Sequence, residues 1–146
     1  MIQRIQSIFL LLASGSAFSL FAFPFASAGD MGATSVFADG LYNIMDNIAL
    51  IILFCLAGLL TFIAIFLFRD RKKQLLIGRV AITANIIGLV LAVVLFINDT
   101  QNMAANVTPD DGFGAYLPFL FLVFAFLANH FIGKDEKLVR SMDRLR

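Results

Sequence analysis

The stretch NIALIILFCLAGLLTFIAIFLFRDRKKQ, residues 47–74, decides how this chain folds. Its first part, 47–68, is apolar apart from Asn47 and Thr61. A helix of that length rises about 30 Å, which is the thickness of the hydrocarbon core of a membrane. Its second part supplies a block of basic residues directly after the apolar run. This order is typical of a transmembrane helix that ends at the cytoplasmic surface.

Three further apolar runs lie on either side of this stretch, and they span residues 7–28, 75–98 and 113–133. Together with 47–68 they predict four transmembrane helices within residues 1–133, and therefore an all-α membrane protein. The composition agrees, because the mean hydropathy is +0.91 and only 14% of the residues are charged. In soluble domains about a quarter of the residues are charged. We therefore expect the lipid bilayer to surround most of the chain.

The charges are segregated along the sequence. All eleven Lys and Arg residues lie beside the N-terminus, in 69–79 or in 134–146. The connections 29–46 and 99–112 carry aspartates and no basic residue. Short loops that hold Lys and Arg stay on the cytoplasmic side of a membrane. The pattern thus predicts an N-in, C-in topology, with both termini and the basic connection in the cytoplasm of a bacterial inner membrane.

Residues 7–28 allow a second interpretation. Arg4, an apolar run, Pro24 and Ala-Ser-Ala before Gly29 are also typical of a cleavable signal peptide. The run is longer than the apolar segment of a signal peptide, which has about 7 to 15 residues, and this favours a retained helix. Both interpretations give the later helices the same orientation.

Four polar residues inside the predicted helices are candidate functional groups: Arg79, Asn85, Asn129 and His130. Arg79 and His130 lie near cytoplasmic helix ends, where a long or amphipathic side chain can reach the headgroups. Arg79 could instead form a buried ion pair or contact a substrate, and His130 could carry a proton. Asn85 and Asn129 can hydrogen-bond between helices, which is worth about 0.6 to 2 kcal/mol in membranes.

Small residues recur every four positions at Ala84, Gly88 and Ala92. This spacing gives one smooth stripe, along which another backbone can approach closely. We predict that the stripe is a helix-packing seam. The short connection favours an antiparallel neighbour, so the expected partner is the preceding helix, with Ala57 and Gly58 at its middle.

Aromatic residues are plentiful, with 17 Phe but no Trp and two Tyr. The phenylalanines are best interpreted as lipid-facing bulk and ring packing. Tyr42 and Tyr116 both fall near the outer boundary of the predicted helices. There they are expected to lie at the lipid interface.

Motifs for catalysis are missing from the sequence. It has no nucleotide-binding glycine loop, no metalloprotease helix motif and no nucleophile elbow. Its single cysteine, Cys55, and single histidine, His130, form no metal-binding pattern. We predict no catalytic residue, no cofactor, no metal and no nucleic-acid partner, which makes an enzyme the least favoured class.

The last residues, 134–146, are mostly charged, but apolar residues recur among them at helical spacing. Gly133 and then Asp135 predict a break followed by a short cytoplasmic helix. That helix is amphipathic and alone is marginal in water, so it needs lipid headgroups, the connection 69–74 or another protein to fold against. Its balanced charge makes attraction to anionic lipid weak. The predicted docking residues are Leu138, Val139, Arg140, Met142, Arg144 and Leu145.

The two ends of the chain carry a resemblance. MIQRIQSIFLLLAS at 1–14 and KDEKLVRSMDRLR at 134–146 resemble a family of small four-helix inner-membrane proteins of unknown function from Bacteroidota. The resemblance implies that the N-terminal helix is retained and that the acidic loops are periplasmic. It implies no substrate, cofactor or catalytic residue.

Two functional hypotheses follow. The first is a non-enzymatic accessory or scaffold subunit, which docks onto other membrane-protein subunits through its cytoplasmic termini and the seam. The alternative is a small homo-oligomeric transporter or channel, with the four polar residues along its path. A transporter usually has polar or broken segments at the membrane midplane, where this chain is mostly apolar.

Overall fold

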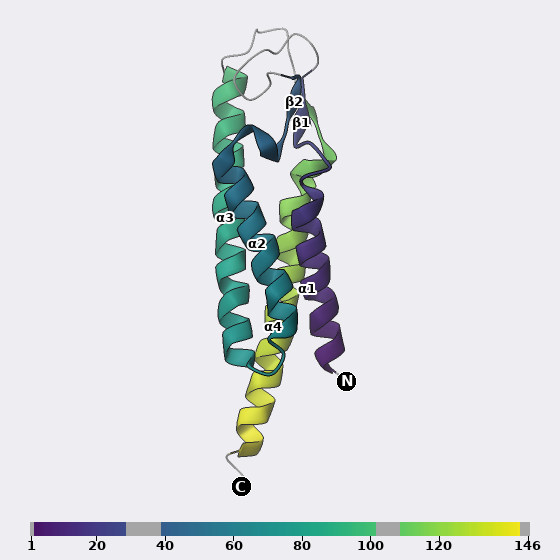
Figure 1. Ribbon diagram of the computed structural model, residues 1–146, viewed down its shortest axis with the longest axis vertical. Helices are drawn as coiled ribbons and strands as arrows, with labels where there is room; N and C mark the ends of the chain where they lie inside the picture. Colours follow the sequence, from purple (N-terminus) through teal and green to yellow (C-terminus); the bar gives the residue numbers. More distant parts are fainter. Residues whose placement is uncertain (1, 29–38, 102–108, 144–146) are drawn as a thin grey trace.

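The computed structural model describes residues 2–28, 39–101 and 109–143, and this part of the chain forms a bundle of long helices. The helices are α1 (Ile2–Ser19), α2 (Ile48–Phe66), α3 (Arg71–Gln101) and α4 (Leu117–Asp143). α1 packs against α2 and α4, and α3 packs against the same two helices. Both chain ends lie at one end of the bundle (Figure 1). We call it the basic end, because it also holds the turn between α2 and α3 with its basic residues.

Within the described residues, three helical segments are long and apolar enough to cross a membrane. They are Ile48–Phe66, Arg71–Gln101 and Phe113–Val139. The chain is therefore a multi-pass helical membrane protein. The apolar part of α1, Ile5–Ser19, is shorter than these three.

α1 differs from its predicted range. It begins at Ile2 and ends at Ser19, so the prediction of a helix over 7–28 is wrong at its C-terminal side. The chain leaves the helix through turn hydrogen bonds, such as that from the Phe21 N–H to the Phe18 carbonyl at 3.2 Å. Pro24 follows, and proline lacks an N–H group and favours an extended preceding residue, which prevents the helix from continuing.

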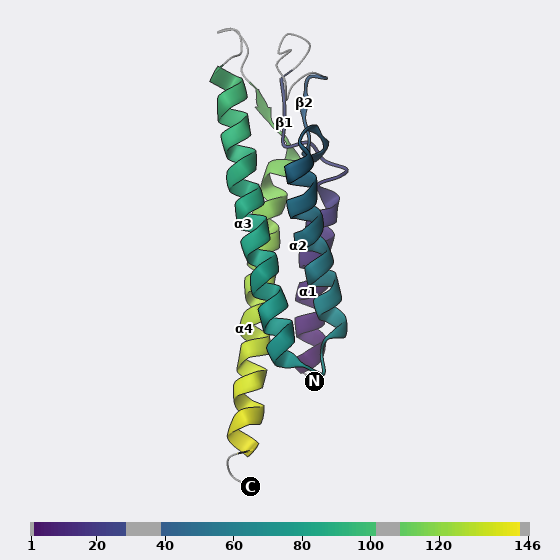
Figure 2. The same ribbon diagram turned by 60° about the vertical axis from the view of Figure 1, so that its left-hand side comes forward.

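α4 is longer than predicted, because it passes through Gly133 without a break. The predicted stop at Gly133 and separate helix after it are wrong. Gly133 does not have a positive φ angle, so it is not a left-handed cap. α4 therefore extends beyond the other helices at the basic end (Figures 1 and 2).

α2 and α3 form an antiparallel hairpin. Asn47 caps α2, since its side-chain oxygen accepts a hydrogen bond from the Ala49 N–H at 2.9 Å. Asp70 does the same for α3, accepting from the Lys73 N–H at 3.2 Å. Basic residues predicted for the connection, Arg71 to Lys73, thus belong to the first turn of α3.

The all-α prediction missed a small sheet at the opposite end of the bundle, which we call the sheet end. Its strands are β1 (Ala26–Ser27), β2 (Leu41–Tyr42) and β3 (Asp110–Asp111), in the antiparallel order β2-β1-β3. The segment before β1 is held on both sides. The Phe25 N–H donates to the Tyr42 carbonyl at 2.7 Å, and the Phe25 carbonyl accepts from the Gly112 N–H at 2.8 Å.

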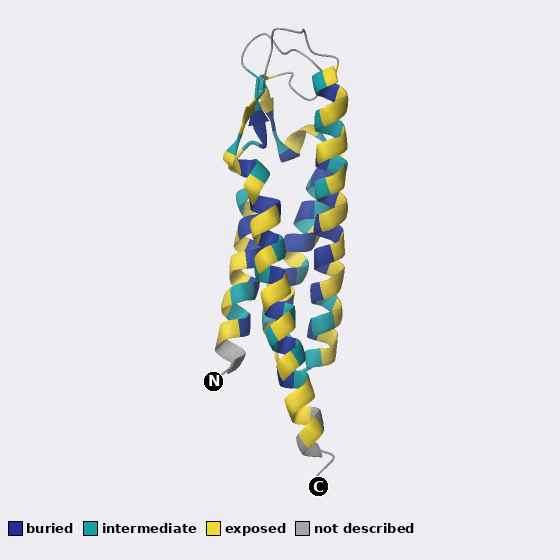
Figure 3. Cartoon of the chain, turned by 180° about the vertical axis from the view of Figure 1, so that it is seen from behind, coloured by how far each residue is buried: buried dark blue, intermediate teal, exposed yellow. Residues whose placement is uncertain are grey.

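The core consists of three clusters of buried residues along the bundle. The cluster at the sheet end contains Phe25, Tyr42 and Phe54, whereas the middle cluster is mostly alanine. Many large aliphatic and aromatic side chains are exposed instead. The exposed residues lie on the outer faces of the helices (Figure 3). Small residues inside and large ones outside are typical of helices that pack in lipid, where close backbone approach holds them together.

Candidate functional site

The predicted seam lies inside the bundle. Ala84, Gly88 and Ala92 are all buried. A Cβ atom at Gly88 would lie 3.1 Å from the ring of Phe54 in α2. Since α2 of the same chain covers the seam at Gly88, this face is not open to a partner protein.

Asn85 is fully buried between α3 and α4. Its side-chain N–H donates to the Pro118 carbonyl at 3.2 Å. Its Oδ1 atom has no hydrogen-bond partner among the residues that the structure describes. Asn85 therefore joins two helices with one half of its amide group.

Two more buried amide oxygens lie toward the basic end. Asn129 lies beside Gly78, where any Cβ atom would collide with its amide. Its Oδ1 has no hydrogen-bond partner within the described ranges of the chain. Gln74, which the sequence interpretation missed, donates from its side chain to the Ala64 carbonyl at 2.9 Å. Its Oε1 has no partner in the part of the chain that the structure describes. A glutamine that directly follows a run of basic residues at a helix start gives no sequence signal of burial.

Arg79 and His130 face outward. Both side chains are exposed, and the His130 ring contacts Phe131 edge-on, with centroids 5.7 Å apart. Asn85 and Asn129 have buried amide oxygens instead. The structure thus does not gather the four predicted polar residues into one path through a single chain.

A polar pair missed by the sequence interpretation joins α1 to α4. The Gln6 side-chain N–H donates to the Asp135 carboxylate at 2.8 Å, and both residues are buried. Hydrogen bonds to charged groups contribute about 1.5 to 3 kcal/mol. The pair therefore fixes α4 at the point where it leaves the bundle. The prediction that Asp135 caps a new helix is therefore wrong, because Asp135 lies within the continuous helix α4.

Beyond Asp135, α4 has little cover. Leu138 is 49% exposed and Val139 is 37% exposed. Arg140 and Met142 lie on the same helix. Arg144 and Leu145, the other predicted docking residues, lie outside the described residues. We call residues 136–143 the α4 extension, and its apolar side chains Leu138 and Val139 lack the cover that the bundle gives to core residues.

A hollow of about 540 Å³ lies between the α4 extension and the turn of the α2–α3 hairpin, and we call it the basic hollow. Asp70, on its rim, forms a salt bridge with Lys73 at 3.0 Å. The hydrogen bond from Lys73 lowers the pKa of Asp70. This carboxylate is therefore ionised and already paired. The residues that line the basic hollow are Phe68, Arg69, Asp70, Arg71, Lys72, Glu136 and Val139.

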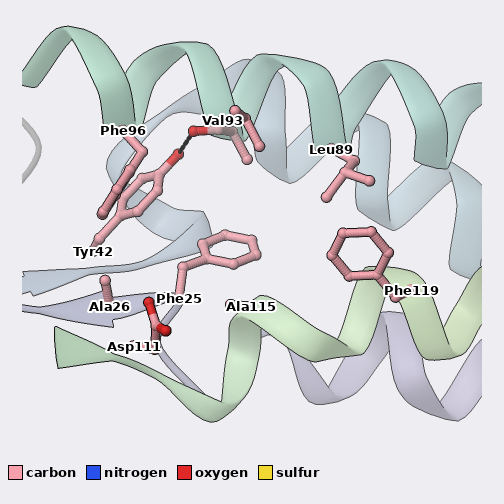
Figure 4. Close-up of a pocket in the computed structure, with 10 residues that line it drawn as sticks. Phe25, Ala26, Tyr42, Leu89, Val93, Phe96, Asp111, Ala115 and Phe119 are labelled. Carbon is pink, nitrogen blue, oxygen red and sulfur yellow. Dashed lines mark hydrogen bonds between the residues drawn. The ribbon is translucent and has the colours of Figure 1, made fainter.

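A second, apolar cavity of about 160 Å³ lies at the sheet end between α3 and α4. Phe25 points into it from the segment before β1, and Leu89 and Phe119 meet across its far side (Figure 4). The Tyr42 hydroxyl beside it donates to the Ala92 carbonyl at 2.8 Å. Tyr42 is only 2% exposed, so the prediction that it lies at the lipid interface is wrong. Tyr116 is exposed, as expected of an interfacial residue.

Metal-binding chemistry finds no support in the described part of the chain. No three His, Cys, Asp or Glu side chains come together there. The single cysteine, Cys55, is a partly buried free thiol.

Comparison with known proteins gives one match. Residues 2–145 match the profile of a protein family described as a domain of unknown function (DUF4293). Neither the curated proteins nor the solved structures contain a match.

Proposed function

The chain belongs to the family DUF4293, a domain family of unknown function, and from its geometry we propose that it is a non-enzymatic accessory subunit of a bacterial inner-membrane complex. The α4 extension carries this proposal, since it projects past the bundle with Leu138 and Val139 uncovered. Burying a leucine side chain is worth about 1.5 to 3 kcal/mol. A partner that covers these two side chains would therefore gain binding energy.

We place the basic end in the cytoplasm. The turn between α2 and α3 supplies Arg69, the first turn of α3 supplies Lys72, and the last part of α4 supplies Lys134 and Lys137. Aspartates lie at the sheet end, in β3 and before α2. Basic cytoplasmic ends and acidic outer ends are the usual arrangement, and the resemblance to inner-membrane proteins from Bacteroidota supports the same assignment.

In this topology α1 is a fourth transmembrane helix. Its 18 residues would rise about 27 Å, and tight packing against α2 and α4 supports it along its length. Its N-terminus lies at the basic end with the C-terminus of the chain (Figure 1). An even number of membrane crossings agrees with that placement.

Photo-crosslinking in native membranes tests the accessory role. A photoreactive residue replaces Leu138 in one version of the chain and Ile87, which is similarly exposed on the bundle surface, in the other. We expect one defined protein adduct from position 138 and lipid adducts from position 87. We also expect Leu138→Glu to abolish co-purification of that partner, whereas Ile87→Ala leaves it unchanged. Lipid adducts alone at both positions would contradict an accessory role.

A homo-oligomeric transporter is the second candidate. It is favoured by three buried amide oxygens that have no partner among the described side chains and backbone, those of Gln74, Asn85 and Asn129, because amide oxygens bind cations and water. Exposed Arg79 and His130 would then lie between copies. Reconstituted vesicles with a flux that Asn85→Leu abolishes would establish this function instead.

A further inference from the structure

We propose that the basic hollow binds the phosphate of an anionic phospholipid headgroup from the adjacent leaflet. This site does not require that a partner protein exist, so it stands apart from the accessory role. Four observations support it: the depth of the hollow, its unpaired charges, its apolar wall and its fixed shape.

The depth of the hollow matches that of the headgroups. Phe66, near the end of α2, is 65% exposed, and Phe68 is 52% exposed. Arg69 follows immediately and is also exposed. The surface therefore changes from apolar to charged within one residue at Phe68, which lines the hollow. Such a change marks the boundary between hydrocarbon and headgroups.

The charges around the hollow leave an excess of positive charge. Arg69, Arg71 and Lys72 form no salt bridge with any carboxylate among the described side chains. Asp70 is already paired with Lys73, so Glu136 is the only remaining carboxylate among the lining residues. Three cations face one anion, and arginine in particular suits bidentate binding of phosphate oxygens.

The wall of the hollow also favours a lipid over a free phosphate ion. Phe68 and Val139 add apolar surface beside the three cations. A phospholipid presents a phosphate with glycerol and acyl groups attached, and these can cover such surface. Basic pockets between transmembrane helices on the cytoplasmic side are known to bind lipid headgroups.

The two sides of the hollow are held in place relative to one another. Asp135, next to Glu136 on α4, is fixed by its hydrogen bond from Gln6. The opposite side is fixed by the cap of α3 at Asp70. A site whose backbone is positioned before binding loses less entropy when the ligand binds.

Lipid titration of the full-length protein tests the proposal. Binding of phosphatidylglycerol and of phosphatidylcholine is measured by native mass spectrometry. The test variant is Arg69→Gln with Lys72→Gln, and the matched control is Lys134→Gln with Lys137→Gln. Both remove two positive charges from exposed side chains at the basic end, but only the first pair lines the hollow.

We expect the protein to prefer phosphatidylglycerol. Each basic residue near a membrane surface contributes about fivefold in affinity. The affinity of the test variant for phosphatidylglycerol should therefore fall about 25-fold, and that of the control variant much less. Glu136→Gln should increase affinity, because it removes the opposing carboxylate. Circular dichroism of each variant verifies that its helices are intact.

Three results would overturn the proposal. One is an equal loss of affinity for phosphatidylglycerol in the test and control variants, which indicates general attraction of the lipid to the charged surface. Another is equal binding of the two lipids. The third is displacement of the lipid by inorganic phosphate alone at similar concentration, which indicates a phosphate-ion site.

Discussion

Buried polar side chains join the helices of this bundle at single residues, and Asp135 of α4 is one of them. Asp135 lies two positions after Gly133 in a charged segment, and this sequence context predicts a helix cap. Its hydrogen-bond partner is Gln6, which lies 129 positions earlier in the chain. No local pattern encodes such a contact, so the sequence predicted the charge of Asp135 but not its burial.

Tyr42 is a second residue whose environment the sequence did not reveal. It lies in β2, where its ring packs against Phe25 with centroids 5.2 Å apart. Burial raises the pKa of its hydroxyl, and the nearby carboxylates of Asp46 and Asp99 raise it further. The folded protein therefore favours the neutral phenol.

This raised pKa predicts a loss of stability in alkali. The unfolded chain ionises Tyr42 at pH about 10, so its stabilising effect is complete below that value and declines as the pH rises above it. Tyr116→Phe leaves Tyr42 as the only tyrosine, and the chain has no tryptophan. We expect phenolate absorbance to be absent from the folded variant at pH 10 and to appear on unfolding. Half-ionisation near pH 10 in the folded state would contradict the structure.

At the scale of elements, apolar length predicted α2 well and the ends of the other helices poorly. α2 begins at Ile48 and ends at Phe66, close to the predicted 47–68. α1 ended early in the turns before Pro24. α4 continued through Gly133, and the hydrogen bond between Gln6 and Asp135 holds the helix beyond this glycine against α1. The sheet could not be predicted from the sequence, because each strand has two residues and the hydrogen bonds of the sheet join segments that are distant in the sequence.

Two glycines in helices provide a test of these elements. A Cβ atom at Gly133 has nothing within 4 Å, whereas one at Gly88 meets the Phe54 ring at 3.1 Å. Gly133→Leu should stabilise the protein by up to about 1 kcal/mol, because leucine favours a continuous helix. Gly88→Leu should destabilise it by about 1 to 3 kcal/mol through overpacking.

The measurement is reversible unfolding of both variants in mixed micelles, followed by circular dichroism. Opposite signs are expected from the same substitution. If Gly133→Leu also destabilised the protein, α4 would not be a continuous helix in solution. That result would support the helix break at Gly133 that the sequence predicts.

At the scale of the whole molecule, the segregation of charge in the sequence corresponds to segregation in space. The basic turn and both chain ends lie at one end of the bundle, and the sheet lies at the other (Figure 1). α1 supplies Leu10, Ala13 and Ala17 to the core, and Leu20 and Phe25 follow it, so a chain cut after Ala28 would lose part of all three clusters. This packing favours retention of residues 1–28.

Cysteine labelling of whole cells tests this topology. In a Cys55→Ser background, Asp39→Cys and Lys137→Cys each introduce one exposed thiol at opposite ends of the molecule. We expect an impermeant maleimide to label position 39 in cells whose outer membrane is permeabilised, and to label position 137 only after lysis. The intact mass of the labelled chain should include residues 1–28. Labelling of position 137 before lysis would reverse the proposed orientation.

The order β2-β1-β3 also has a consequence for biogenesis. As the chain is synthesised, β1 can pair with β2 as soon as the first two helices are inserted. Its other edge stays open until residues 110–111 follow α3 across the bilayer, and an open edge readily pairs with foreign chains. Closure of the sheet is thus one of the last events of insertion, and a nascent or truncated chain without α4 would expose that edge to chaperones and proteases.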